Sequence, residues 1–319
     1  MAKDIDNIKD GIIGFAVGDA LGVPAEFKTR EELKRYPITE MIGNGTYLVP
    51  KGTWSDDTSM TLATMKSIIE KNGINTNDMA DKFIDWFRNG NYTATNQCFD
   101  IGRTTFQALA KYELKLDDAV NCGLDGEMDN GNGSLMRMLP IAYYIAFENY
   151  KHFDIDDKTI YNIVKDVSSI THRHETSILG CYIFVKFAIE IIEGKFKDIA
   201  YEYIKNLDYS FFKDETIAKY RRILKENIKE QKEENIKTTG YIVDTLEAVL
   251  WLFVNSKDYN TTILKAVNLG DDTDTVAAIT GGLLGIHYGI ENINKKWKED
   301  LKKTNYIKCL CDEFYDIMK

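Results

Sequence analysis

Helical periodicity dominates this sequence and limits what the chain can fold into. In YIVDTLEAVLWLFV (residues 241–254), apolar side chains return every three or four residues, which places them on one face of a helix. Residues 215–231 repeat this pattern, with Lys, Arg and Glu on the opposite face. Strand-like alternation is scarce, and its best example is the short segment TYLVP at residues 46–50. The chain is therefore predicted to be mostly α-helical.

Two acidic segments lie near opposite ends of the 319-residue chain. The first is GTWSDDTSM at residues 52–60, and the second is GDDTDTVAA at residues 270–278. A chain of this length can form one large domain or two ordinary ones, and the polar stretch around Tyr150 is a possible boundary. If the two acidic segments meet in space, however, the two ends of the chain must fold together. We therefore expect a single domain over residues 1–319.

Charge and cysteine content narrow the class of protein. The formal net charge of −10 argues against a non-specific nucleic-acid binder, which needs a basic face to displace counterions. The N-terminus shows no signal-peptide core, and no apolar run is long enough to cross a bilayer. The five cysteines are odd in number and scattered, which suits reduced thiols in a cytoplasm better than a disulfide framework. We expect a cytoplasmic protein without a membrane partner.

Each acidic segment also looks like the start of a helix. Ser55 is a suitable N-cap for a helix through residues 60–70, and Asp274 or Thr275 for a helix through residues 276–289. Carboxylates in a first helical turn are favoured by the helix dipole. Capping alone would therefore account for either segment taken by itself.

The number of carboxylates goes beyond what capping needs. Asp56 and Asp57 are adjacent, as are Asp271 and Asp272, with Asp274 close behind. Carboxylates packed this closely repel one another unless a cation offsets their charge. The hydroxyls beside them complete an oxygen-only ligand set of the kind that Mg²⁺, Mn²⁺ or Ca²⁺ prefers. The Gly- and Ala-rich helix after the second segment permits close approach of another backbone. These features predict two halves of one divalent-metal site, holding one or two ions.

Six segments in chain order resemble the ADP-ribosylglycohydrolases, in particular the dinitrogenase-reductase-activating glycohydrolase type. They are GFAVGDALGVPAEF (14–27), GTWSDDTSM (52–60), GNGSLMRMLPIA (131–142), the pair at 171–172, GYIVDTLEAVLW (240–251) and GDDTDTVAAITGGLLG (270–285). The likeness extends over nearly the whole chain. It implies an all-α, single-domain orthogonal helical bundle with a binuclear site for two Mg²⁺ or Mn²⁺ ions at its centre.

The resemblance also implies roles for individual acids and hydroxyls. It assigns the metal ligands as Ser55, Asp56, Asp57, Asp272, Asp274 and Thr275, with Asp271 outside the site. The catalytic candidates are Asp56 or Asp57, either of which would take a proton from a water, and Glu26, which matches an acid near the scissile bond. Without the resemblance, Glu26 would be taken as a surface residue following Pro24.

Substrate contacts follow from the same resemblance. Asn132, Gly133 and Ser134 form a short glycine-bearing segment that holds a diphosphate in relatives, although such sequences are also common turns. His172 is implied to contact the ribose or the diphosphate. Tyr241 is expected either to stack on adenine or to pack in the core. Asp100 is expected to pair with a substrate guanidinium if the acceptor is arginine.

The function implied is metal-dependent hydrolysis of the bond between ribose C1″ of ADP-ribose and its acceptor. An ADP-ribosylated protein or a small ADP-ribose conjugate is the expected partner, and arginine is the favoured acceptor. Serine-linked ADP-ribose and O-acetyl-ADP-ribose are further candidate substrates. The same residues would also suit a two-metal phosphoesterase or an inactive ADP-ribose-binding relative. A separation of the two acidic segments in the fold would exclude the shared metal site.

Overall fold

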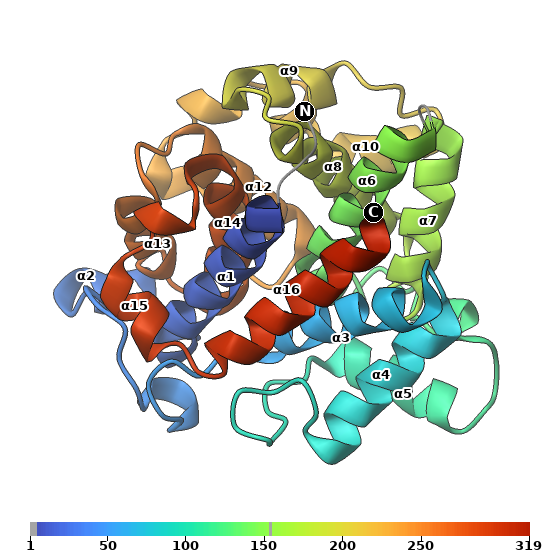
Figure 1. Ribbon diagram of the computed structural model, residues 1–319. Helices are drawn as coiled ribbons and strands as arrows, with labels where there is room; N and C mark the ends of the chain where they lie inside the picture. Colours follow the sequence, from blue (N-terminus) through green and yellow to red (C-terminus); the bar gives the residue numbers. More distant parts are fainter. Residues whose placement is uncertain (1–4, 153–154) are drawn as a thin grey trace.

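The computed structural model describes residues 5–152 and 155–319, which form α-helices joined by short 3₁₀ helices and loops (Figure 1). The α-helices, in chain order, are α1 (Ile5–Gly22), α2 (Arg30–Arg35), α3 (Asp56–Lys71), α4 (Thr76–Asn89), α5 (Arg103–Glu113), α6 (Leu139–His152), α7 (Asp157–Ser169), α8 (Glu175–Ile192), α9 (Lys197–Lys205), α10 (Asp214–Lys219), α11 (Arg221–Leu224), α12 (Ile242–Val254), α13 (Tyr259–Val267), α14 (Thr273–Tyr288), α15 (Lys295–Asp300) and α16 (Thr304–Met318). The 3₁₀ helices are η1 (Val23–Ala25), η2 (Gly45–Tyr47), η3 (Ala119–Asn121), η4 (Asn132–Arg137), η5 (Ile228–Glu230), η6 (Glu233–Asn235) and η7 (Ile290–Asn292). Extended pairing within these residues is limited to isolated bridges, so the all-α expectation is confirmed.

Helices from the two ends of the chain pack along each other at the centre. A Cβ atom added to Gly18 of α1 would lie 2.1 Å from the carbonyl oxygen of Ala277 in α14. At Gly22 the nearest atom would be the Cα of Asp274, at 2.3 Å. The small residues of both helices therefore let the backbones touch, as the Gly- and Ala-rich sequence of α14 indicated. This contact brings the start of α14 against the end of α1.

Replacement of Gly18 by alanine is expected to force α1 and α14 apart. Because the new methyl group would meet backbone rather than a movable side chain, the cost should reach about 3 kcal/mol of unfolding free energy. Thermal unfolding measures the effect. Gly102→Ala is the matched control, since a Cβ there meets nothing within 4 Å. Equal stability of the two variants would contradict the close approach.

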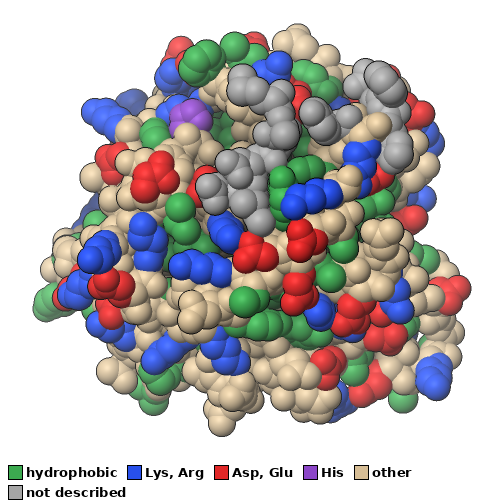
Figure 2. All heavy atoms as spheres, in the orientation of Figure 1, with side chains coloured by type: hydrophobic (Ala, Val, Ile, Leu, Met, Phe, Trp, Pro, Cys, Tyr) green, Lys and Arg blue, Asp and Glu red, His purple; other side chains and the backbone are tan. Residues whose placement is uncertain are grey.

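The remaining helices surround this central pair (Figure 1). The helices α8, α12 and α14 are buried on nearly every side, and α8 packs against α6, α7, α9, α12 and α14. The C-terminal helix α16 runs alongside α1 and also contacts α3, which in turn packs against α4. On the face drawn in Figure 2, acidic and basic side chains are interspersed over the surface. None of the helices in the described part of the chain combines the length and apolarity that a membrane crossing requires.

The best strand candidate forms no strand, and two local predictions were wrong. Residues 46–50 form no strand, because the chain turns through η2 and only Asn44 and Val49 pair as an isolated bridge. Residues 215–231 are not one helix: α10 ends before Tyr220, whose hydroxyl donates to the carbonyl of Thr176 in the core, and the chain turns there. The helix α14 begins at Thr273, before the predicted caps Asp274 and Thr275.

The sequence also suggested a domain boundary near Tyr150. That polar stretch joins α6 to α7, and its residues 153–154 lie outside the described residues. Other local predictions were correct: Ser55 caps α3, and residues 242–254 form the single helix α12.

Candidate metal and substrate site

The first acidic segment forms the N-terminus of α3, which is anchored by an acid from α1. The Ser55 side chain caps the helix by accepting the backbone N–H of Asp57 at 3.3 Å. Asp19 accepts the Ser55 backbone N–H at 2.8 Å through one oxygen, and the Thr58 N–H and hydroxyl at 3.0 and 2.6 Å through the other. Both oxygens of Asp19 are thus already used, which makes Asp19 a residue that positions the start of α3.

The second acidic segment meets the first at the start of α14. The Thr275 hydroxyl donates to Asp57 Oδ2 at 3.2 Å, and the Ser55 hydroxyl donates to the same oxygen at 3.0 Å. Asp57 and Asp274 are completely buried. The two segments therefore converge, and the condition that would have excluded a shared site is not met.

A third contribution comes from two loops that precede α2 and α5. Glu26 follows η1 and is almost fully buried, and its backbone carbonyl accepts the hydroxyl of Thr46 at 2.6 Å. Asp100 lies before α5 with a left-handed backbone, φ +60°, and its Oδ1 accepts the Tyr47 hydroxyl at 2.5 Å. Carboxylate oxygens of Glu26, Asp100 and Asp274 lie within 4.8 Å of one another. A second group within the same limit contains Asp19, Asp57 and Asp274, so Asp274 belongs to both.

Burial and mutual repulsion raise the pKa values of these carboxyl groups. Desolvation raises the pKa of Asp19 to about 6. For Glu26, desolvation followed by the charges of Asp100 and Asp272 raises the pKa to about 9. The pKa values of Asp56, Asp57 and Asp274 are raised well above the usual range, first by burial and then by the neighbouring acids. Without a cation, the cluster therefore holds protons near neutral pH.

Several carboxylate oxygens in this cluster have no protein partner. They are buried and accept no hydrogen bond: Glu26 Oε2, Asp57 Oδ1 and Asp274 Oδ2. A buried acceptor without a partner is costly, and buried polar groups are normally satisfied. Oxygen-only donors that converge from three segments suit a hard divalent cation. The residues present therefore fit a divalent-metal site.

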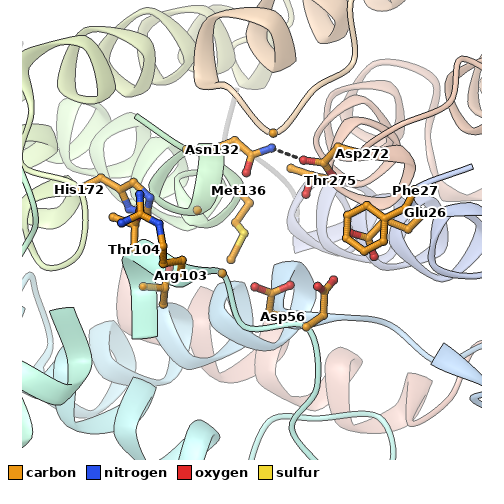
Figure 3. Close-up of a pocket in the computed structure, with 16 residues that line it drawn as sticks. Glu26, Phe27, Asp56, Arg103, Thr104, Asn132, Met136, His172, Asp272 and Thr275 are labelled. Carbon is orange, nitrogen blue, oxygen red and sulfur yellow. Dashed lines mark hydrogen bonds between the residues drawn. The ribbon is translucent and has the colours of Figure 1, made fainter. Parts of the chain in front are cut away.

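A pocket of about 250 Å³ opens beside the acids (Figure 3). Glu26, Asp56, Asp100, Asp272 and Thr275 line it. In Figure 3, Phe27, Glu26, Asp272 and Thr275 lie on one side of the pocket, and His172, Thr104 and Arg103 lie on the other. The acidic side and the side that carries Arg103 therefore differ in charge.

His172 is held in one orientation behind the glycine segment. Desolvation, followed by the charges of Arg137 and Arg103, lowers the pKa of His172 to about 3, so its ring is neutral. The Thr171 hydroxyl oxygen accepts from Arg137 at 3.0 Å and lies 2.8 Å from His172 Nδ1. The oxygen accepts from Arg137, and we assign the hydroxyl proton to Nδ1, which places the ring proton on Nε2. A Cβ on Gly131 would lie 3.4 Å from Nε2, so glycine leaves this donor uncovered.

The residues predicted to contact the substrate differ in how far their side chains are buried. The Asn132 amide donates to Asp272 Oδ2 at 2.7 Å, which links the glycine segment to the acids. Gly133 lines the pocket. The Ser134 hydroxyl is turned into the core, where it accepts from Ser168 at 3.1 Å and lies 3.3 Å from Cys181 Sγ. Tyr241 is 36% exposed and pairs through its backbone with Gly131. The segment begins η4, with the apolar helix α6 only afterwards.

The structure adds residues that sequence reasoning missed. Phe27, Arg103, Thr104 and Met136 line the pocket. Phe27 follows Glu26 directly, and Arg103 and Thr104 lie in the same FDIGRTT segment as Asp100. Their closeness in sequence to a predicted site residue was therefore a signal that could have found them. No sequence signal marks Tyr47, which reaches Asp100 from a separate loop.

The fold and this acid-lined pocket define the class of the protein. The chain belongs to the ADP-ribosylglycohydrolase family, whose family model matches residues 1–319. It is therefore an enzyme of the glycosidase class. The resemblance noted in the sequence is confirmed.

Individual relatives agree with this assignment. The chain is 31% identical to "ADP-ribosylarginine hydrolase Tri1" of Serratia proteamaculans, and the match covers 98% of this chain and 80% of that protein. It is 28% identical to "ADP-ribosyl-[dinitrogen reductase] glycohydrolase" of Rhodospirillum rubrum over 95% and 93% of the two chains. A solved structure entitled "ADP-ribosylglycohydrolase-related protein complex" superposes with a TM-score of 0.79 at 28% identity, covering 99% of this chain and all of that one.

Proposed function

We propose that this enzyme hydrolyses the bond between ribose C1″ and the guanidinium of ADP-ribosyl-arginine, on proteins or small conjugates, and releases ADP-ribose. The observation that carries the proposal is the convergence of two acidic segments, with unpartnered buried oxygens, beside a pocket whose other side carries Arg103 and His172. Arginine as the acceptor is supported by relatives named ADP-ribosylarginine hydrolases.

We further propose that the cofactors are two Mg²⁺ or Mn²⁺ ions. The residues that would hold them are Ser55, Asp56, Asp57, Asp272, Asp274 and Thr275. Asp100, whose carboxylate lies near those of Glu26 and Asp274, is assigned to the guanidinium of the acceptor. Such cations, when bound, neutralise the carboxylates, fix the ribose hydroxyls and acidify a water. Two ions rather than one are what the family resemblance implies, and Asp274, whose carboxylate lies near those of both Asp57 and Glu26, is placed to contact both.

The side chains of the pocket divide the remaining work. Glu26 lines the pocket and has an unpartnered Oε2, so we assign it the role of general base that accepts a proton from the attacking water. Asp56 also lines the pocket and is the second candidate for this role. Asp57 is enclosed by the hydroxyls of Ser55 and Thr275, which favours a role in holding metal over proton transfer.

The far side of the pocket suits the ADP-ribose. The uncovered Nε2–H of His172, together with Gly133 and Asn132, would contact the ribose and the diphosphate. Ser134 would contribute only its backbone, because its hydroxyl is bound by Ser168 in the core. Tyr241, which is exposed and pairs through its backbone with the pocket residue Gly131, is assigned to adenine. Helices from both ends of the chain supply this one site, and we therefore propose that residues 1–319 act as a single domain. Five unpaired cysteines support a cytoplasmic location.

The test is hydrolysis of ADP-ribosyl-arginine by the purified protein with Mg²⁺, with Mn²⁺ and with chelator, with the product identified by mass. We expect metal-dependent release of intact ADP-ribose and free arginine. Release of AMP or phosphate would instead indicate a phosphoesterase. Activity only on serine-linked or O-acetyl substrates would show that the acceptor is not arginine. Binding of ADP-ribose without turnover would overturn the enzymatic proposal.

A further inference from the structure

Phe27 combines a strained backbone with an exposed aromatic ring at the pocket. Its φ of +63° lies in the left-handed region, which bulky side chains rarely adopt. Its side chain is 67% exposed although it lines the pocket. The folded protein therefore bears the backbone strain without recovering it by burying the ring. Strain of this kind, kept in place by the surrounding structure, is characteristic of ligand-binding positions.

The backbone around Phe27 is fixed by two loops. The Phe27 N–H donates to the carbonyl of Asp271 at 2.8 Å, and the Asp271 N–H donates to the carbonyl of Lys28 at 2.9 Å. On the other side, the Glu26 carbonyl accepts the Thr46 hydroxyl. The same bonds that hold Glu26 and the start of α14 thus also hold the backbone from which the Phe27 ring projects. Phe27 is therefore anchored at its backbone in the wall of the pocket.

The exposed face of the Phe27 ring suits a cationic partner. Phe27 lies on the side of the pocket that carries Glu26 and Asp272, across from Arg103 (Figure 3). Arg103 itself is engaged by Asp129, with its Nη2 2.7 Å from Oδ1. The negative face of an aromatic ring attracts a planar cation, and a guanidinium stacks on such a face better than an ammonium does.

From these observations we propose that Phe27 is an acceptor-binding residue whose ring stacks on the guanidinium of the ADP-ribosylated arginine. This inference rests on the proposed function and extends it, since it identifies what recognises the acceptor rather than the ADP-ribose. The diphosphate and adenine, which carry no positive charge, belong on the opposite side with Arg103 and His172. Phe27 should therefore affect the acceptor and leave ADP-ribose binding unchanged.

The test compares Phe27→Leu, which removes the aromatic face, with Phe27→Tyr, which keeps it. The readouts are KM and kcat for ADP-ribosyl-arginine with metal, the affinity for ADP-ribose by calorimetry, and the unfolding temperature. We expect Phe27→Leu to raise KM about tenfold, the loss that one cation–π contact in a partly desolvated site produces. Phe27→Tyr should retain the wild-type KM, and both variants should bind ADP-ribose as the wild type does.

Leu48→Ala is the matched control. Leu48 is also an exposed apolar residue with a left-handed backbone, at φ +56° and 79% exposed, but it does not line the pocket. This variant should leave KM unchanged.

Two results would overturn the inference alone: an unchanged KM in Phe27→Leu, or a loss of ADP-ribose affinity that parallels the rise in KM. Failure of the proposed function is read separately from the wild type. If the wild-type protein does not hydrolyse ADP-ribosyl-arginine under any metal condition, both the arginine acceptor and this role of Phe27 are overturned.

Discussion

Replacement of Asp274 by asparagine is expected to lower kcat/KM for ADP-ribosyl-arginine by about 1000-fold or more, the scale on which loss of electrostatic stabilisation acts in enclosed sites. Asp274 is fully buried, its Oδ2 has no partner, and it belongs to both groups of neighbouring carboxylates. Asparagine has nearly the same shape but carries no charge, so the change should remove cation binding with little effect on packing.

The control for this variant is the nearby Asp271. Its side chain is exposed, and it contributes to neither carboxylate group. Asp271→Asn should retain activity, because the backbone N–H and carbonyl that bind the Lys28–Phe27 segment are unchanged. Calorimetric titration with Mn²⁺ separates the causes: Asp274→Asn should lose metal binding, and Asp271→Asn should keep it. Full activity of Asp274→Asn would contradict the proposed metal site.

The second large effect is a pH-dependent loss of stability when metal is removed. The pKa of Glu26 is raised from 4.5 to about 9 in the folded protein, and that of Asp19 from 3.8 to about 6. Between these limits the folded state binds more protons than the unfolded state, so the unfolding free energy falls as pH rises. Chelated protein should therefore be more stable at pH 5 than at pH 8. This is the reverse of the usual trend for carboxylates that form salt bridges.

Divalent metal should reverse that loss at pH 8. A ligand at a hundred times its dissociation constant stabilises the folded state by about 2.7 kcal/mol, which corresponds to roughly 4 °C in a chain of this size. Thermal unfolding from pH 5 to pH 8, with chelator or with Mn²⁺, measures both effects. We expect the gain from Mn²⁺ to be large at pH 8 and small at pH 5, where protons already neutralise the acids. A gain independent of pH would show that these carboxyl groups do not hold the ion.

Local sequence signals were sufficient for the central features of the site. Ser55 was identifiable as a cap because hydroxyl residues before an apolar run are typical helix starts, and Asp56 and Asp57 were notable because adjacent carboxylates exceed what a cap needs. The glycines of α14 indicated a close neighbour, although not that α1 would be that neighbour. The family resemblance then brought in Glu26, which would otherwise have been taken as a surface residue.

Features that depend on distant contacts could not be read from the sequence. The start of α14 was misplaced because no side-chain cap fixes it; the carboxylate of Asp272 binds Asn132 instead, 140 positions away. The hydrogen bond from Tyr47 to Asp100 joins two separate loops, and the sequence of neither loop indicates that they meet. The left-handed backbone of Phe27 likewise results from its bond to Asp271, which no local pattern encodes.

The pairing of α1 with α14 has a consequence for how the enzyme is made. The Thr273 hydroxyl donates to the carbonyl of Gly22, a residue 251 positions earlier in the chain. During synthesis, α1 therefore cannot pack against α14 until most of the polypeptide has left the ribosome. Contacts between such distant segments slow folding, since a long loop must close before they form. Nascent chains that stop before α14 should be inactive and prone to capture by chaperones, because the glycine face of α1 then has nothing to pack against.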